Sequence, residues 1–246
     1  MIKIITIITK FIIAALMALL FSSCGNCCNF SYGIKGSGNI TSETRNANQD
    51  FKNIKVSQGI KVIVEQADNK SITVETDDNL QKHIITQIEN GVLRIKSDES
   101  YNSTETPIVY VKMPIINGLD SSSGSEITSS NVLITENIHV KSSSGSQINI
   151  NVEADAINIE STSGSSIEAS GKALKLETSS SSGSKIDAEN LMANEVISQT
   201  SSGSSTSVYP IVKLDAKASS GSSISFHKAP KTLIKKESSG GSVDEE

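Results

Sequence analysis

Serine–glycine units recur at nearly constant spacing along the second half of the chain, and this regularity restricts the possible folds more than any other feature. Seven repeat units are each centred on a Ser-Gly pair, and their glycines are 21, 19, 19, 20, 18 and 19 residues apart. These glycines are Gly124, Gly145, Gly164, Gly183, Gly203, Gly221 and Gly240. A flexible linker has no reason to keep this count, whereas a period near 20 residues is typical of a solenoid.

Apolar residues keep the same spacing as the glycines. Three residues after them stand Ile127, Ile148, Ile167, Ile186, Thr206, Ile224 and Val243. Further apolar residues stand five and seven residues before most of the glycines, for example Ile159 and Ile157 before Gly164. The residue three before the glycine is small in the first six units and is Glu237 in the last. Positions separated by two residues share one face of a strand, so these residues predict the interior of a repeating β structure.

The sequence therefore predicts an all-β fold, a right-handed parallel β-helix with coils of about 19 residues. Each coil is expected to have three sides, made of short strands, with Ser-Gly-Ser corners in the second half of the chain. Leucine-rich repeats share this period, but the leucine and asparagine ladder that they require is missing.

The serines beside each glycine have a structural interpretation. Serine precedes all seven glycines and follows the first six. Stacked coils bring equivalent residues about 4.8 Å apart, so rows of hydroxyl groups could satisfy one another's hydrogen bonds from coil to coil. Glycine at a corner accepts a positive φ without a Cβ penalty. We therefore expect the serines to build corners rather than an active site.

The first half of the chain is also rich in strand patterns, but it is less regular. Apolar residues alternate on both sides of Gly59, and Asn90-Gly91 between apolar runs predicts a hairpin. We expect residues 36–106 to form an N-terminal β part of opening coils and hairpin excursions, and residues 107–246 to form the regular repeats. The polar segment 97–106 marks the boundary between them.

The N-terminus has the pattern of an export signal. Lys3 and Lys10 form a short positive region before an apolar stretch, residues 11–21, which is short for a membrane span. Small residues then lead into Cys24, as at a lipoprotein signal peptidase site. We expect residues 1–23 to be a lipoprotein signal peptide, Cys24 to be lipidated and residues 24–35 to form a tether. An ordinary cleaved signal and an uncleaved anchor helix are the alternatives.

The residues after Cys24 bear on where the protein resides. Gly25 stands where retention in the inner membrane would favour aspartate, so we expect a lipid-anchored protein of the outer membrane. Whether the body faces the periplasm or the cell surface is left open. Cys27 and Cys28 lack the later cysteines that a zinc site would need, and their role within the tether is also open.

The composition offers little catalytic chemistry. The net charge of −5 and the absence of a basic stripe argue against nucleic-acid binding. The outward row two residues after the glycines contains no paired acids, and His83, His139 and His227 fall at unrelated repeat positions. Calcium-binding glycine-rich repeats would need an aspartate at fixed spacing, which does not recur. We therefore predict no catalytic residues, no metal site and no cofactor.

Several motifs resemble those of a known family. They are Gly36-Ser37-Gly38-Asn39-Ile40, the run from Phe51 to Val62 around Gly59, Asn79-Leu80, Asn90-Gly91, and the repeated Ser-Gly-Ser-x-Ile. From about Gly36 to Ala229, the chain is similar to the "putative autotransporter adhesin, head GIN domain" family. The resemblance implies a parallel β-helix body behind a secretory or lipoprotein signal. It supplies no catalytic or ligand-binding residues.

These features together favour a non-catalytic lipoprotein of the bacterial cell envelope. Its β-helix is expected to act as an adhesin-like or scaffold surface that binds a glycan or a protein. The alternatives are a polysaccharide-active β-helix enzyme and a hydroxyl-rich solenoid that orders water at a surface. The identity of the ligand and the oligomeric state are left open.

Overall fold

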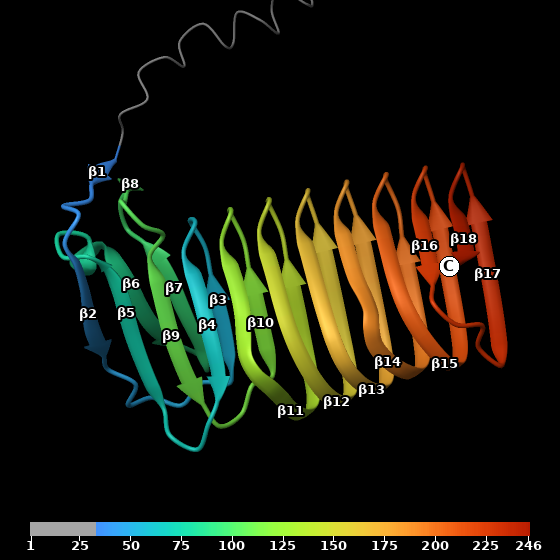
Figure 1. The fold of residues 1–246 in the computed structure, drawn as a ribbon, viewed down its shortest axis with the longest axis horizontal. Coiled ribbons are helices and arrows are strands. Elements are labelled where there is room, and N and C mark those ends of the chain that lie inside the picture. The colour runs from blue at the N-terminus through green and yellow to red at the C-terminus, as the bar shows by residue number, and fades with distance from the viewer. Residues whose placement is uncertain (1–32) are drawn as a thin grey trace, which may run out of the picture.

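The computed structural model describes residues 33–246, which form an elongated β-solenoid (Figure 1). Residues 1–32, with the predicted signal peptide, Cys24, Cys27 and Cys28, lie outside the described part of the chain. Apart from one 3₁₀ turn, η1 (Gln81–His83), every regular element that is described is a strand. Within residues 33–246, no helix is long and apolar enough to span a membrane.

Two groups of strands make up the fold. The N-terminal group contains β1 (Ile34–Lys35), β2 (Ile40–Arg45), β3 (Asn53–Val56), β4 (Lys61–Gln66), β5 (Ser71–Asp77), β6 (Ile84–Glu89), β7 (Val92–Ser97), β8 (Tyr101–Asn102), β9 (Ile108–Met113) and β10 (Gly118–Ser121). The repeat region contains β11 (Glu126–Ser142), β12 (Gln147–Thr162), β13 (Ser166–Ser181), β14 (Lys185–Thr200), β15 (Ser205–Ser219), β16 (Ser223–Phe226), β17 (Thr232–Ser238) and β18 (Ser242–Glu245).

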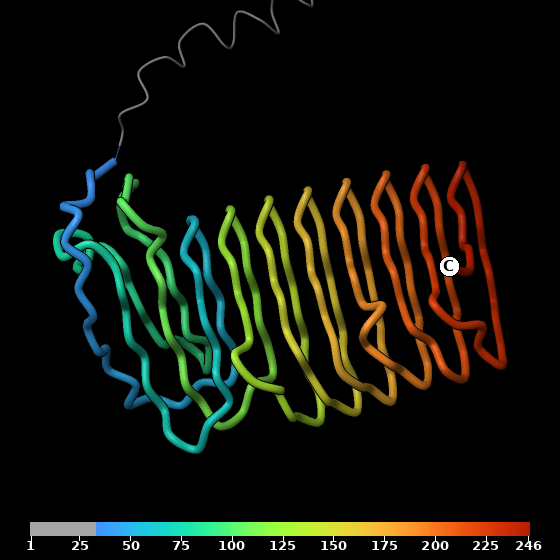
Figure 2. Tube along the Cα trace, viewed as in Figure 1, coloured from blue at the N-terminus to red at the C-terminus, as the bar shows by residue number. Residues whose placement is uncertain are grey.

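The repeat region stacks parallel coils at the predicted spacing. Each residue of β12 lies beside the residue of β13 that follows it by 19 positions, from Gln147 beside Ser166 to Thr162 beside Ser181. The regular coils follow one another along the long axis of the molecule (Figure 2). The predicted all-β solenoid with coils about 19 residues apart is confirmed.

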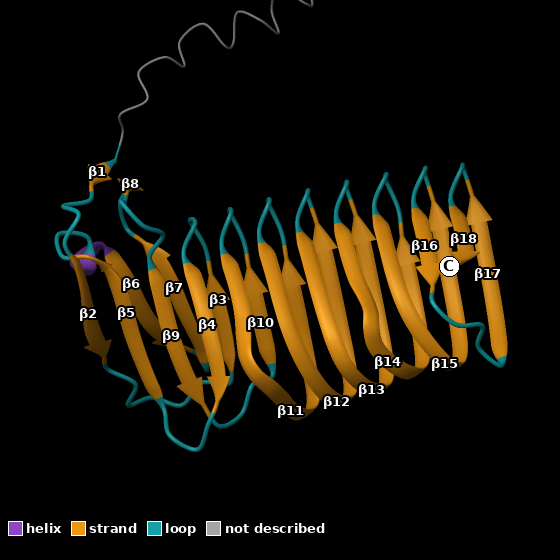
Figure 3. Ribbon diagram, in the orientation of Figure 1, coloured by secondary structure: helices purple, strands orange, loops and turns teal. Residues whose placement is uncertain are grey.

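Each coil has two long sides, and the prediction of three short strands per coil is wrong. β12 is one strand of 16 residues that bends near its middle, so its two halves lie in opposite faces (Figure 3). β4 pairs with the first half of β11, whereas β10 pairs with the second half, which shows that the halves belong to different faces. The first half of each long strand follows a Ser-Gly turn and lies in what we call the post-turn face. The second half precedes the next turn and lies in the pre-turn face. A tight Ser-Gly turn joins them at the turn edge, and the bent strands join them at the bend edge.

The N-terminal part extends both faces and closes the end of the solenoid. β3 and β4 form an opening coil around a turn at Gln58-Gly59. Residues 67–117 then form an excursion on the N-terminal side of this coil, after which β10 lies beside β3 on its other side. Within this excursion, β7 and β9 add parallel strands beside β3 and β4. β6, β5 and β2 follow as antiparallel strands at the outer end. The hairpin predicted at Asn90-Gly91 joins β6 to β7.

A single continuous core runs through the solenoid between its two faces. Inward residues of each coil are buried, and within each face they alternate with outward, mostly polar residues. Ile148, Ile167 and Ile186 stack in one row, and each has no more than 2% of its surface exposed. Each coil therefore buries its apolar side chains only against its own two faces and the neighbouring coils.

Candidate binding surface

The seven predicted glycines all lie in the turns of the turn edge, at φ between 68° and 76°. The serine before each of them also has a positive φ, between 49° and 58°, which the sequence did not predict. In the turn at Gly164, the N–H of Ser165 donates to the carbonyl of Thr162 across the two central residues. Two consecutive positive φ values identify these as type I′ turns, the type that matches the twist of flanking strands.

The turns are joined to one another by a backbone ladder. The N–H of Gly145 donates to the carbonyl of Ser163 in the next coil at 3.1 Å, and equivalent bonds connect the other turns. A Cβ added at Gly164 would meet nothing within 4 Å, so the positive φ rather than crowding selects glycine there.

Serines beneath the turns are buried, and the serine that follows the turn glycine makes several hydrogen bonds. The hydroxyl of Ser165 lies within donating distance of the carbonyls of Ser142, in the preceding coil, and Thr162, at 2.8 and 2.7 Å. It accepts the N–H of Thr162 at 3.1 Å and lies 2.9 Å from the hydroxyl of Ser161. The bond to the preceding coil therefore runs from hydroxyl to carbonyl, not from hydroxyl to hydroxyl as predicted. These serines hold the coils together and are not available to a ligand.

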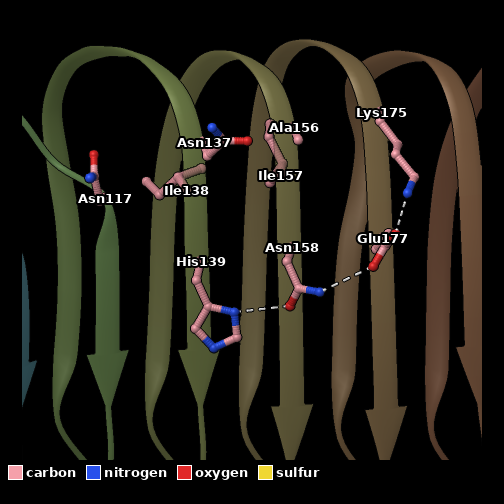
Figure 4. A pocket seen from close by; sticks show the side chains of 9 residues that line it. All are labelled: Asn117, Asn137, Ile138, His139, Ala156, Ile157, Asn158, Lys175 and Glu177. Carbon is pink, nitrogen blue, oxygen red and sulfur yellow. Dashed lines mark hydrogen bonds and ion pairs between the residues drawn. The ribbon is translucent and has the colours of Figure 1, made fainter.

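The pre-turn face carries a row of polar side chains that point outward from successive coils (Figure 4). His139, Asn158 and Glu177 each lie six residues before a turn glycine and stand side by side on β11, β12 and β13. Nδ1 of His139 is 3.0 Å from Oδ1 of Asn158, and Nδ2 of Asn158 donates to Oε2 of Glu177 at 3.5 Å. Lys175 forms an ion pair with Glu177 at 2.6 Å. The row thus forms one connected polar chain across three coils.

A shallow groove of about 350 Å³ accompanies this row. Small Ala156, between Asn137 and Lys175 on the neighbouring coils, leaves the space open. The hydrogen bond from Lys175 holds the pKa of the Glu177 carboxyl below its usual value and raises the pKa of Lys175 itself. Both groups are therefore charged at neutral pH. The groove offers amide, imidazole, carboxylate and ammonium groups one coil apart, a set suited to binding polar ligands.

The post-turn face carries a second polar groove, lined by Lys61, Glu126, Asn149, Glu168 and other residues. Lys61 pairs with Glu126 at 2.8 Å, and Lys185 pairs with Asp187 at 2.9 Å. The hydrogen bond to Asp187 raises the pKa of Lys185. Each lysine of this groove thus has an acidic partner, and Glu168 accepts a hydrogen bond from Nδ2 of Asn149 at 3.2 Å.

The three histidines lie in separate places. His83 contacts Asp98 at 2.9 Å in the N-terminal part, and the ring of His227 lies 5.5 Å from that of Tyr209 near the C-terminal end. Among residues 33–246, no group of three His, Cys, Asp or Glu side chains could hold a metal ion.

The repeat pattern of the core does not reveal the pre-turn row, because His139 differs in residue type from the residues in register with it. Its register partners, Asn158 and Glu177, stand at the same offset from Gly164 and Gly183. Tabulating the outward offsets as well as the inward ones would have placed these residues in one row.

Solved structures share this fold. A protein from Bacteroides fragilis described as a "putative adhesin" is 17% identical, with a TM-score of 0.80 over 87% of this chain and 100% of its own. A "putative adhesin" from Parabacteroides merdae is 17% identical, with a TM-score of 0.72 over 88% and 100% of the two chains. A "putative lipid binding protein" from Parabacteroides distasonis is 18% identical, with a TM-score of 0.71 over 87% and 99%.

A search of curated proteins finds no match to the chain. Residues 50–230 match the family described as "Putative auto-transporter adhesin, head GIN domain". The matched residues cover the opening coil, the N-terminal excursion and nearly all of the regular repeats. Because they make up well over half of the sequence, the chain belongs to this family.

Proposed function

We propose that the protein is a non-catalytic, lipid-anchored protein of the cell envelope whose solenoid presents an adhesin-like binding surface. The observation that carries this proposal is the pre-turn face, where outward polar side chains recur in register on successive coils beside an open groove. Such a surface suits an extended partner, because each neighbouring coil adds another polar side chain to the same row. The described adhesins with the same fold support this function.

The chemistry of the faces favours binding over catalysis. In the described part of the chain, Lys175 and Glu177 neutralise each other, and His139 contacts an amide rather than a nucleophile or a carboxylate. An enzyme that cleaves polysaccharides would need clustered carboxyl groups, a metal site or a basic catalyst on one face.

The anchor is tested by metabolic labelling with radioactive palmitate. We expect the native chain to be labelled and to fractionate with the membrane, and Cys24→Ala to lose the label. A control with Cys27 and Cys28 both changed to alanine keeps the label if Cys24 is the acylated residue. A Cys24→Ala chain that is labelled like the native chain would contradict a lipid anchor at this position.

The exposed side of the membrane is tested by adding protease to intact cells and to cells with a permeabilised outer membrane. Cleavage on intact cells is expected for a surface adhesin. Protection until permeabilisation would exclude adhesion to other cells and leave a scaffold role within the envelope.

Lipid binding is a second candidate, because exposed apolar side chains gather at the bend edge. Ile134 is 66% exposed and Leu174 is 56% exposed, and with Met192 they line a groove of about 450 Å³. Glu153 and Asp155 line the same groove, which disfavours anionic headgroups. We expect the unacylated Cys24→Ala chain to float with phosphatidylcholine vesicles. The same chain with Ile134→Gln/Leu174→Gln should no longer float. Absence of flotation by the Cys24→Ala parent would remove this candidate.

A further inference from the structure

One outward row of the pre-turn face changes its charge pattern along the solenoid. The row lies four residues before each turn glycine and reads Lys55, Asp120, Lys141, Glu160, Ser179, Gln199, Lys217 and Lys236 in order of stacking. In its first half, lysine alternates with acid: Lys55 pairs with Asp120 at 2.7 Å, and Lys141 pairs with Glu160 at 3.0 Å.

The last two positions of the row break this alternation. Lys217 on β15 lies directly beside Lys236 on β17. Within residues 33–246, neither ammonium group forms an ion pair or a hydrogen bond. Like charges placed opposite each other in a sheet are destabilising, so this arrangement lowers stability unless an anion lies between the two groups. A carboxylate at either position would have continued the pattern of the first half.

A groove of about 410 Å³ lies beside the two lysines. Its lining combines both lysines with the amide of Gln199 and the hydroxyl groups of Ser179, Ser201, Ser219 and Ser238. Thr200 also lines the groove, but its hydroxyl donates to Thr206 in the interior. Glu237 also lines the groove, but its Oε1 accepts the N–H of Val243 at 2.8 Å. Asp215 lies two residues before Lys217 on the same face of β15, and Lys213 lies two residues before Asp215. The outward side chains of this region thus carry a net positive charge.

We propose that this groove binds a sulfate or carboxylate group carried on an acidic glycan. The two ammonium groups supply charge-assisted donors for the anion, and the hydroxyl and amide groups match the hydroxyls of a sugar. No large exposed apolar side chain lines the groove, so nothing there would hold an acyl chain. The proposal deepens the binding role of the pre-turn face, and it rests on that role.

The test measures binding of the full-length chain to dextran sulfate, with neutral dextran as the matched polymer that lacks the anion. We expect native protein to bind dextran sulfate and not dextran, with an affinity that falls as salt is added. Lys217→Gln/Lys236→Gln should weaken this binding by roughly tenfold or more, because two charge-assisted hydrogen bonds are lost. The control, Lys55→Gln/Lys141→Gln, removes the same charge from the same row and should bind like the native protein.

A second measurement detects the anion without a polymer. Sodium sulfate should raise the melting temperature of the native protein more than that of Lys217→Gln/Lys236→Gln, compared at equal ionic strength with sodium chloride. This comparison also shows that the double variant is folded, since its own melting curve is recorded.

Three results would overturn the proposal. Equal binding of dextran sulfate by the native chain and the Lys217→Gln/Lys236→Gln variant would place the anion elsewhere. If both double variants lost the same amount of affinity for dextran sulfate, the binding would depend on net charge and not on this groove. Binding to phosphatidylglycerol vesicles through Lys217 and Lys236, without binding to dextran sulfate, would assign the site to a lipid headgroup. Protection from protease on intact cells would contradict the proposed surface adhesion but would not change the binding of dextran sulfate. Failure of the proposed function and failure of this site can therefore be distinguished.

Discussion

Serine occupies a left-handed conformation in all seven turns of the repeat region, although its Cβ disfavours that conformation. A non-glycine residue in this region costs about 1–2 kcal/mol, and asparagine tolerates it better than serine. The hairpin at Asn90-Gly91 has the same pair of positive φ values with the preferred residues. The turns of the solenoid thus keep a serine where asparagine would be more stable.

This comparison predicts opposite effects for two neighbouring substitutions. Ser163→Asn should raise the free energy of unfolding by a few tenths of a kcal/mol to about 1 kcal/mol, whereas Gly164→Ala should lower it by about 1–2 kcal/mol. Urea-induced unfolding measures both. Gly171→Ala is the contrast, because its Cβ would lie 2.0 Å from the carbonyl oxygen of Val152 and should cost more than Gly164→Ala. A stabilising Gly164→Ala would contradict the assigned turn.

Tyr101, on β8, contacts the opening turn at Gln58-Gly59. Ionisation of its hydroxyl should lower the free energy of unfolding at high pH. Its hydroxyl donates to the carbonyl of Gln58 at 2.6 Å, and burial raises its pKa to about 12 from the ordinary value of 10. The folded state therefore holds this proton more tightly than the unfolded state. The resulting stability is present below pH 10 and is lost between about pH 10 and 12.

The matched variant is Tyr101→Phe, which keeps the ring and removes the ionisable group. Native protein should lose about 1–2 kcal/mol more stability than this variant between pH 10 and 12, below the full linkage value because part of the ring faces solvent. Thermal melts across this range measure the difference. Parallel pH profiles for the two proteins would show that Tyr101 is not perturbed.

At the scale of the coil, inward and outward positions on one strand should respond very differently to the same change. Ile167 is 1% exposed in the middle of the stack, and its neighbour Ser166 points outward. Ile167→Asp should cost about 4 kcal/mol or more, because it buries an unpaired carboxylate. Ser166→Asp should change stability by no more than about 0.5 kcal/mol. Similar losses of melting temperature in the two variants would refute the register.

The same alternation explains how much of the coil could be predicted from the sequence. The inward row through Ile127, Ile148 and Ile167 fixed the spacing and the parallel stacking, because burial imposes a period of two on every strand. The number of sides did not follow from one row of the core, because the bend appears only as a shift in which residues face inward, from Ile150 and Val152 before it to Ile157 after it. The opening coil at Gln58-Gly59 was not counted with the repeats, because Val56 and Ile60 replace the serines that mark the other turns.

The outward rows were predicted less completely than the core for a physical reason. Exposed positions are not held to one residue type by packing, so His139, Asn158 and Glu177 share a place on the surface without sharing a chemistry. Their relation becomes visible only when the register is known. The stacked coils could therefore be predicted from the sequence, whereas the groove beside His139, Asn158 and Glu177 required the structure.

For the whole molecule, the two ends of the stack are closed by different means. Antiparallel strands β2, β5 and β6 cover the N-terminal end. At the C-terminal end, β17 is exposed along its whole length, and Lys235 and Glu237 place charges at two of its inward positions. Lys235 lies over the ring of Phe226 at 5.2 Å, and Glu237 accepts the N–H of Val243. Inward charges at an open edge oppose the addition of another strand.

Removing these charges should make the protein associate through β17. Lys235→Ala/Glu237→Ala gives the last coil the residues that occupy the same positions of the preceding coil, Ala216 and Ala218. We expect sedimentation velocity to show larger, concentration-dependent species than in the native chain. Lys236→Ala, which changes an outward lysine, is the control and should sediment like native protein. An unchanged sedimentation profile for the double variant would show that Lys235 and Glu237 do not protect this edge.

The backbone ladder that joins the turns also determines how the molecule responds to mechanical force. Its hydrogen bonds, like those of both faces, point along the long axis, so an axial pull loads every bond between two coils at once (Figure 1). Separating two coils then requires the turn, both faces and the bend to part together. Under tension the rod should stay at constant length until a whole coil boundary ruptures, and should extend in discrete steps rather than by gradual stretching.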